Sequence, residues 1–443
     1  MLAAMPPSPS SPSASGANSA RTRGDACPGS LRLHRADDGA LARVRLPGGV
    51  LTAEQADVLG KLAGELGEGD IHLTSRGNAQ LRALPADCGG ELALRLGESG
   101  LLPSARHERV RNLVASPLSG LDGRGNADVG PWLAELDALL CASGRAVALS
   151  GRFLFALDDG RGDVDALGAD VTLLAQGDGD ALLRVGAAAD AVRVPGAWAA
   201  RAALVAAETF LDSAPDAGTW RVAELPAGPD VLLAQVARKL AAAPARTPGA
   251  VLAGAARSPA PARPREAAAP GFGVVTGGAP GAAALSVGVP LGRVAAAQWR
   301  LLADTARSQG DGTLRLTPWR GVVVPGVAPG RAAALLDALG RAGLVTGPGS
   351  PWSGVGACIG RPGCAKSLSD VRALAGAAVG PVGTLPVYWS GCARRCGHPH
   401  GDRVDVVATA EGHEVSVVRG ASRTAPVVVT DRSLPAAVAA ARG

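Results

Sequence analysis

With 443 residues, the chain is longer than one hydrophobic core usually organises, so we expect two to four packed units. Hydrophobic residues make up 47% of it, yet no stretch approaches the roughly 20 uninterrupted apolar residues of a membrane-spanning helix. The net charge of +5 comes almost entirely from arginines that are not interleaved with aromatic residues, so we predict neither a nucleic-acid nor a membrane partner.

The first residues, 1–24, are rich in Ser, Pro and Ala and lack the basic start and apolar core of a secretory signal. We predict a disordered leader there. The chain has seven cysteines, and this odd number without a signal peptide indicates a reducing compartment, the cytoplasm, and argues against a disulfide framework. Three of them, Cys27, Cys88 and Cys141, stand alone and are expected to be ordinary thiols.

An internal repeat is the clearest sign of organisation. Residues 44–82 align without a gap with residues 287–325, at a constant offset of 243. The alternative is chance similarity in a chain rich in Ala, Gly and Leu, but the matches include less common residues. These matches are Pro47 with Pro290, Gln55 with Gln298 and Thr74 with Thr317.

Each copy predicts the same order of elements. In the first, alternating residues around Val44 predict a strand, and Thr52 with Gln55 forms a capping-box start for a helix. Two short β-like runs follow at 71–77 and 79–84. The second copy repeats this order at 285–290, 295–306, 314–317 and 321–326, so we predict a duplicated β-α-β-β unit. Between the copies, residues 241–270 are crowded with Ala, Pro and Arg and predict a linker.

Four cysteines cluster near the C-terminal end. Cys358 and Cys364 form a C-x5-C pair, and Cys392 and Cys396 form a C-x3-C pair. Four thiolates from two loops can bind a tetrahedral zinc or an iron-sulfur cube. The gaps are wider than the C-x2-C spacing typical of zinc sites, so they favour a [4Fe-4S] cluster, with zinc and unligated thiols as alternatives.

This cysteine pattern, following a duplicated half domain, resembles the sulfite and nitrite reductase superfamily, in which such a cluster lies beside a sirohaem. The resemblance implies an α+β fold: duplicated ferredoxin-like half domains plus two reductase-like α/β domains in a pseudo-twofold arrangement. The implied boundaries are half domains at 25–104 and 271–345, a first reductase-like domain at 105–240 and a cluster domain at 346–443.

Within that superfamily, the segments 27–49, 74–82 and 389–401 look most like the precorrin-3B synthase branch. That likeness implies an oxidoreductase that hydroxylates precorrin-3A with dioxygen and forms a lactone, in aerobic cobalamin biosynthesis. It also implies a non-haem iron and an external electron donor, either ferredoxin or an NAD(P)H-linked reductase. A sirohaem-dependent sulfite or nitrite reductase and a non-catalytic electron carrier are the alternatives.

A tetrapyrrole carries a rim of carboxylates, which guanidinium groups bind in bidentate fashion. We therefore expect cofactor or substrate contacts from polar residues on the first repeat, on the segment after it and on the turn of the second repeat. A solvated strand edge is the alternative for Arg76 and Arg82. The predicted binding residues are Arg76, Asn78, Gln80, Arg82, Arg111 and Arg320, and Arg111 and Arg152 are the predicted catalytic residues.

The resemblance implies two lysines, one residue apart, where this chain has Arg152 and Leu154. Losing one cation makes multi-proton reduction of a bound anion harder, whereas neutral dioxygen does not need that charge. This departure favours the oxygenase over the reductases. His398 and His400 are candidate iron ligands, with an exposed loop as the alternative.

Overall fold

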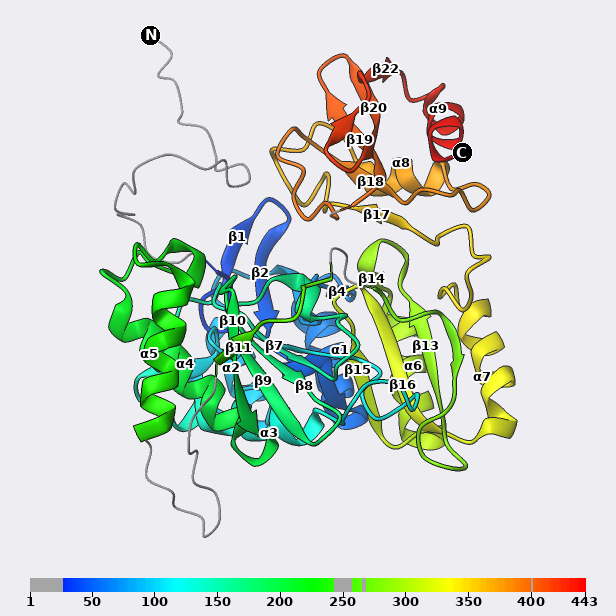
Figure 1. Ribbon diagram of the computed structural model, residues 1–443. Helices are drawn as coiled ribbons and strands as arrows, with labels where there is room; N and C mark the ends of the chain where they lie inside the picture. The colour runs from blue at the N-terminus through cyan, green and yellow to red at the C-terminus, as the bar shows by residue number, and fades with distance from the viewer. Residues whose placement is uncertain (1–26, 243–256, 265–267, 400) are drawn as a thin grey trace. The chain divides into compact units, whose positions relative to one another are not determined.

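The computed structural model describes residues 27–242, 257–264, 268–399 and 401–443 (Figure 1). The chain divides into two compact units, one containing residues 25–348 and the other containing residues 349–443. The predicted leader and much of the predicted linker lie outside the described residues, and the finer domain boundaries stay predictions. In the part of the chain that is described, no helix is long and apolar enough to cross a membrane.

The first half domain is a five-stranded antiparallel sheet with strand order β1-β2-β5-β4-β14, packed against two helices. The capping box that begins its long helix is present, since Thr52 Oγ1 accepts from Gln55 N and Thr52 N donates to Gln55 Oε1. Its elements are β1 (His34–Ala36), β2 (Gly39–Val44), β3 (Val50–Thr52), α1 (Ala53–Leu66), β4 (Ile71–Leu73), β5 (Ala79–Leu84) and α2 (Gly89–Glu98).

The second half domain repeats this arrangement in a sheet with strand order β12-β13-β16-β15-β3. Only half of the capping box is kept, because Ala295 has no hydroxyl although its N–H still donates to Gln298 Oε1. The predicted duplication is therefore confirmed. The elements are β12 (Gly273–Val275), β13 (Ala283–Gly288), β14 (Arg293–Val294), α6 (Ala296–Gln309), β15 (Thr313–Leu316), β16 (Gly321–Val327) and α7 (Pro329–Arg341).

The two half domains exchange edge strands. β3 of the first copy pairs with β15 of the second, where Leu51 lies opposite Leu314. β14 of the second copy pairs with β4 of the first, where Val294 lies opposite Ile71. These pairs are equivalent under the 243-residue repeat, and all four side chains are buried. Each half domain thus supplies an edge strand that completes the sheet of the other.

Helices α1 and α6 pack together across the same pseudo-twofold relation. Trp299, the repeat equivalent of Ala56, is fully buried and donates its indole N–H to Ala56 O at 2.7 Å. Gly60 leaves room for this ring, because a Cβ there would lie 3.0 Å from Trp299 Cδ1. One continuous hydrophobic core therefore joins both half domains.

Two α/β domains complete the chain, one in each unit. Each sheet begins with three parallel strands and continues with an antiparallel one. The first domain contains β6 (Leu113–Ala115), β7 (Phe155–Asp158), β8 (Val171–Ala175), β9 (Asp180–Val185), β10 (Asp190–Pro195) and β11 (Arg257–Pro259), with α3 (Gly130–Ala142), α4 (Ala199–Ser213) and α5 (Gly228–Ala242). The second contains β17 (Val355–Ala357), β18 (Val387–Ser390), β19 (Arg403–Thr409), β20 (Gly412–Arg419), β21 (Ser422–Arg423) and β22 (Val427–Val429), with α8 (Val371–Ala377) and α9 (Leu434–Arg442).

The close approach of the half domains predicts a large effect of one methyl group. Gly49 has a φ of +73°, and a Cβ there would lie 1.9 Å from Leu316 O, so Gly49→Ala should lower the free energy of unfolding by more than about 2 kcal/mol. Gly64, exposed in α1 with nothing within 4 Å of its Cβ position, is the matched control. Gly64→Ala should raise stability by about 0.5–1 kcal/mol. Urea unfolding measures both, and equal stability of Gly49→Ala and wild type would contradict the packing.

Candidate functional site

The two loops that carry the cysteines both begin at the same edge of the C-terminal sheet. Cys358 directly follows β17, and Cys392 lies two residues after β18. These strands are parallel neighbours with Ala357 opposite Trp389, so their carboxyl ends meet. Cys358 N also donates to Trp389 O at 2.9 Å, which extends the pairing to the cysteine itself.

All four predicted cysteines come together. Burial, and then the negative charges of Cys392, Cys358 and Cys364, raise the pKa of the Cys396 thiol. Among the described residues, no three of these sulfurs lie within 4.8 Å of one another. A single tetrahedral zinc with Zn–S bonds of about 2.3 Å requires sulfurs about 3.8 Å apart. The four sulfurs do not adopt that spacing in this structure.

The backbone holds the two cysteine loops against each other. Gly391 N donates to Cys358 Sγ at 3.2 Å, and Leu368 N donates to Gly391 O at 2.7 Å. Gly391 has no room for a side chain, because a Cβ there would lie 1.8 Å from Ser367 Oγ. These two hydrogen bonds join the loop of Cys358 and Cys364 to the loop of Cys392 and Cys396.

The candidate iron ligands after Cys396 are only partly described. His398 Nδ1 lies 2.8 Å from Arg395 O, an interaction within its own loop. His400 lies outside the described residues. Tyr388 donates its hydroxyl to Cys396 O at 2.7 Å and so anchors the second cysteine loop to β18.

The first α/β domain has the same loop arrangement without cysteines. Ser116 directly follows β6 as Cys358 follows β17, and Ser116 N donates to Leu157 O at 3.0 Å. Asp159 N donates to Ser116 Oγ at 3.1 Å, which matches the bond from Gly391 N to Cys358 Sγ. The two sheets are thus related copies, and only the C-terminal one places thiols at its loops.

Three carboxylates occupy the corresponding region of the first α/β domain. Oxygens of Asp158, Asp159 and Asp163 lie within 4.8 Å of one another, and all three residues are buried. Asp158 accepts four backbone N–H bonds, and Asp159 is bidentate with Arg161. Asp163 accepts from Ser116 Oγ at 2.6 Å. These bonds explain the cluster as a structural network that orders the loop after β7.

An arginine cluster lies around Gly151 in the larger unit; we define it as Arg43, Arg45, Arg76, Arg152 and Arg221. Arg45 Nη2 and Arg76 Nη1 both donate to Gly151 O, at 3.1 and 3.5 Å. The guanidinium of Arg152 lies 4.9 Å from the ring centre of Trp220. Arg221, next to that tryptophan, pairs with Asp170 at 2.6 Å. Asp170 thus brings one negative charge to this group of guanidinium ions.

The pKa of Arg76 is changed by its burial and by the neighbouring arginines. Burial, and then the positive charge of Arg221, lower its pKa to about 10, with Arg43 adding to the effect. Within the described part of the chain, no carboxylate lies within ion-pair distance of Arg76. A desolvated guanidinium without a carboxylate is costly, so this position suits an anionic ligand.

The other predicted contact residues have different environments. Arg82 forms a bidentate pair with Asp38, and Arg111 forms one with Asp137. Both carboxylate partners come from the chain itself, so these two arginines stabilise the half domain and the segment after it. Buried Asn78 accepts from Leu46 N at 2.9 Å.

Two predicted residues, Gln80 and Arg320, are half-buried. Gln80 of β5 is half-buried and lies between Arg43 and His72 in the register of the sheet, on the same face as both. Arg320 has a φ of +59°, and its side chain packs closely on Gly292. Of the predicted set, Arg76 and Arg152 are therefore the ones that lie together in the arginine cluster, with Gln80 opposite Arg43.

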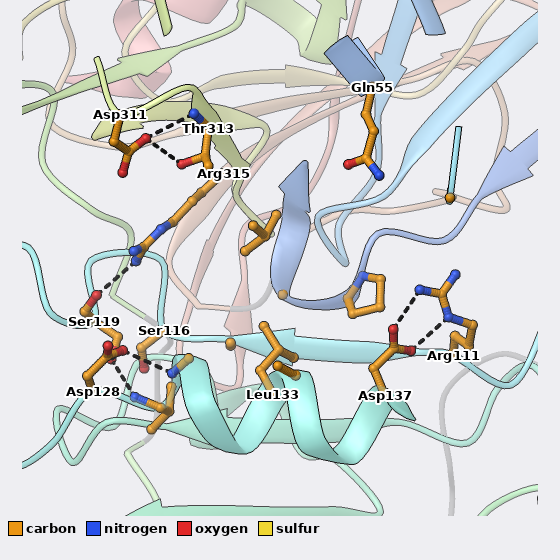
Figure 2. A pocket seen from close by; sticks show the side chains of 18 residues that line it. Gln55, Arg111, Ser116, Ser119, Asp128, Leu133, Asp137, Asp311, Thr313 and Arg315 are labelled. Atoms are coloured by element: carbon orange, nitrogen blue, oxygen red, sulfur yellow. Dashed lines mark hydrogen bonds and ion pairs between the residues drawn. The ribbon is translucent and has the colours of Figure 1, made fainter. Parts of the chain in front are cut away.

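A cavity of about 500 Å³ lies elsewhere in the larger unit, between the turn at Pro47, helix α3 and strand β15. Figure 2 shows Arg111 turned onto Asp137 at one end and Arg315 reaching toward Ser119 at the other. Its lining carboxylates outnumber its guanidinium groups, so it suits a polycarboxylate less well than the arginine cluster does. They are Asp128, Asp137 and Asp311, against Arg111 and Arg315.

Three members of the arginine cluster were not among the predicted site residues. Arg43 and Arg45 alternate with the buried residues Ala42, Val44 and Leu46, so period-two reading of this strand places both on the face away from the core. That signal was present in the sequence. Arg221 had no such signal, because its place depends on the long-range pair with Asp170.

The carboxylate network predicts a pH-dependent stability. Burial raises the pKa of Asp163 to about 7, so the folded chain keeps a proton that the unfolded chain loses near pH 4. The free energy of unfolding should therefore fall by about 3 kcal/mol as pH rises from 4 to 7. Asp163→Asn should remove this part of the slope, and Glu98→Gln, on the surface of α2, should not. Unchanged slopes in both variants would show that Asp163 ionises normally.

Comparison with known proteins agrees with this architecture. The nitrite/sulfite reductase ferredoxin-like half domain matches twice, at residues 33–96 and 278–342. The solved structure of the Mycobacterium tuberculosis NirA protein superposes with a TM-score of 0.69 at 20% identity, over 90% of this chain and 79% of that one. The predicted fold class is confirmed by these two findings.

Curated relatives divide into one long match and shorter ones. A precorrin-3B synthase from Sinorhizobium sp. is 28% identical over 430 residues, covering 94% of this chain and 87% of that protein. A ferredoxin–nitrite reductase from Synechococcus elongatus is 32% identical over 127 residues, 27% of this chain and 25% of the relative. Another, from Leptolyngbya laminosa, is 33% identical over 84 residues, 18% and 16% respectively. The chain thus carries two matches to the nitrite/sulfite reductase ferredoxin-like half domain and is similar to a precorrin-3B synthase over nearly its whole length.

Proposed function

We propose that this chain is a precorrin-3B synthase, a monooxygenase that hydroxylates precorrin-3A with dioxygen and forms a lactone in aerobic cobalamin biosynthesis. The observation that carries the proposal is the similarity over 94% of the chain, against 27% or less for the nitrite reductases. One oxygen atom enters the product, so an external donor, ferredoxin or an NAD(P)H-linked reductase, has to supply electrons. We place the enzyme in the cytoplasm because its free thiols suit a reducing compartment.

The cysteine site supports a resident cluster. Cys358, Cys364, Cys392 and Cys396 would hold a [4Fe-4S] cluster, which supplies one-electron transfer when bound. Their spacing along the sequence, C-x5-C and C-x3-C, is wider than the C-x2-C typical of zinc sites, and Gly391 N donates to Cys358 Sγ. A non-haem iron comes from the resemblance alone, with sirohaem as the alternative.

The arginine cluster supports a polycarboxylate substrate. Arg76 and Arg152, joined by Arg43, Arg45 and Arg221, would bind the acetate and propionate groups of the macrocycle. Asn112 positions Arg45 through a 3.0 Å bond to its guanidinium. We give Arg111 a structural role instead of a catalytic one, because its guanidinium already forms an ion pair with Asp137.

Leu154 separates the two candidate chemistries. Its side chain is buried in an apolar group with Val114, Ala156, Val164 and Ala169. This segment therefore supplies one cation, Arg152, to the site. A reductase that protonates a bound anion repeatedly needs more proton-donating groups, whereas oxygen insertion into a bound macrocycle does not need a second cation there.

A sirohaem-dependent nitrite or sulfite reductase is the second candidate. The matching stretches of two ferredoxin–nitrite reductases favour it, as does the cationic character of the arginine cluster. The absorption spectrum separates the two functions, because strong sirohaem bands in the purified protein would contradict the oxygenase.

The activity itself is tested directly. Anaerobically purified, cluster-loaded protein is mixed with precorrin-3A, a chemical reductant and ¹⁸O-labelled dioxygen. The molecular mass of the product is then measured by mass spectrometry. The expected product is a hydroxylactone carrying one labelled oxygen atom. Unchanged precorrin-3A in the presence of an intact cluster would refute the proposal.

The cysteine assignment predicts a selective loss. Cys364→Ser should abolish both the electron paramagnetic resonance signal of the reduced cluster and turnover, because one ligand of four is removed. Cys141→Ser, in the first α/β domain, should leave both unchanged. A normal cluster signal in Cys364→Ser would exclude this residue as a ligand.

The arginine cluster predicts a salt-sensitive binding defect. Arg76→Gln should weaken binding of uroporphyrin III, a stable octacarboxylate tetrapyrrole, about tenfold, because one charge-assisted bond is lost. Arg193→Gln, a surface residue of β10 paired with Asp180, is the control. Absorbance titration at low and high salt measures both, and equal affinities would remove Arg76 from the site.

A further inference from the structure

The tight turns of the two half domains have the same backbone structure but different side chains. In the first, Thr74 Oγ1 accepts from Asn78 N at 3.1 Å, and in the second, Thr317 Oγ1 accepts from Gly321 N at 3.0 Å. Arg76 and Trp319 therefore occupy equivalent positions two residues into each turn. Where one copy presents a guanidinium, the other presents an indole.

The two turns meet each other and reach the same segment of chain. Gly77 lies against the second turn, since a Cβ there would be 2.7 Å from Leu316 O. Arg76 donates to Gly151 O, and Trp319 packs on the apolar group that contains Leu154. The first turn thus places a cation at Gly151, and the second places an aromatic ring on the apolar group to which Leu154 belongs.

Trp319 differs from the core tryptophans of this chain. Trp299 and Trp389 are fully buried, whereas Trp319 is half-buried at the tip of a turn. The ring packs against the apolar group that contains Leu154, and the residue as a whole is only partly buried. A supported, partly exposed indole offers a rigid flat surface at low cost in conformational entropy.

We propose that Trp319 is a positioning residue for a flat macrocycle, which packs its apolar face on the indole while the arginine cluster binds its carboxylate rim. This inference rests on the proposed function and deepens it. A tetrapyrrole has both surfaces, an apolar plane and a charged edge, whereas a small inorganic anion has only charge. Trp319, supported by the apolar group of Leu154, selects for the plane, and Arg76 with its neighbours selects for the edge.

The test compares three substitutions in the full-length, cluster-loaded protein with uroporphyrin III as the probe. Trp319→Ala should weaken binding about tenfold and raise the KM for precorrin-3A with a smaller effect on kcat. Trp319→Phe should restore most of the affinity because it keeps a flat ring, and Trp319→Leu should not. The fluorescence of wild type should be quenched by the bound porphyrin more than that of Trp319→Phe. Trp198→Ala, at a half-buried tryptophan of the first α/β domain, is the control.

The outcomes separate the two levels of the proposal. Wild-type protein that binds no uroporphyrin III and does not convert precorrin-3A would overturn the proposed function and this inference with it. Wild-type binding that is matched by Trp319→Ala and Trp319→Leu would overturn the inference alone. If Trp319→Ala does not fold, the comparison of Phe with Leu decides, because both keep an apolar side chain of similar size.

Discussion

The exchange of edge strands between the half domains is the constraint on which the larger unit depends. Leu51 opposite Leu314 and Val294 opposite Ile71 are the same contact made twice, once on each side of the pseudo-twofold relation. Because each copy completes the sheet of the other, neither copy can move without breaking its partner's ladder. The turns that follow β4 and β15 are therefore held against each other. This brings Gly77 of the first turn against Leu316, which leads into the second.

Duplication preserved the backbone while the side chains diverged. The left-handed residue Gly77 corresponds to Arg320, and Ala83 corresponds to Gly326, all four with positive φ. A non-glycine residue at such a φ costs about 1 kcal/mol or more, so the shared geometry outweighs local preference. The α/β domains diverged in the same manner. The serine hydroxyl that accepts a backbone N–H after β6 is replaced by a cysteine sulfur after β17, and the loops of that second sheet could then acquire a metal site.

Local patterns in the sequence predicted most of the half-domain fold. The 243-residue offset predicted the two copies, and the Thr52–Gln55 pair predicted the start of α1, because both signals depend on neighbouring residues. The site was predicted less completely. Nothing near Arg82 or Arg111 in the sequence shows that Asp38 and Asp137 occupy them, since those partners lie 44 and 26 residues away. An arginine's availability to a ligand depends on such long-range pairs.

The guanidinium groups of the arginine cluster repel one another, and an anionic ligand would reduce that repulsion. Desolvation and the neighbouring charge of Arg221 lower the pKa of Arg76 to about 10, so the unliganded fold carries repulsion among its own guanidinium groups. Backbone carbonyls such as Gly151 O satisfy hydrogen bonds but bring no negative charge. A polycarboxylate that bound there would supply that charge to the folded state only, so its binding energy would add to the stability of the larger unit. The groups that we propose to recognise the substrate would thus link its binding to folding.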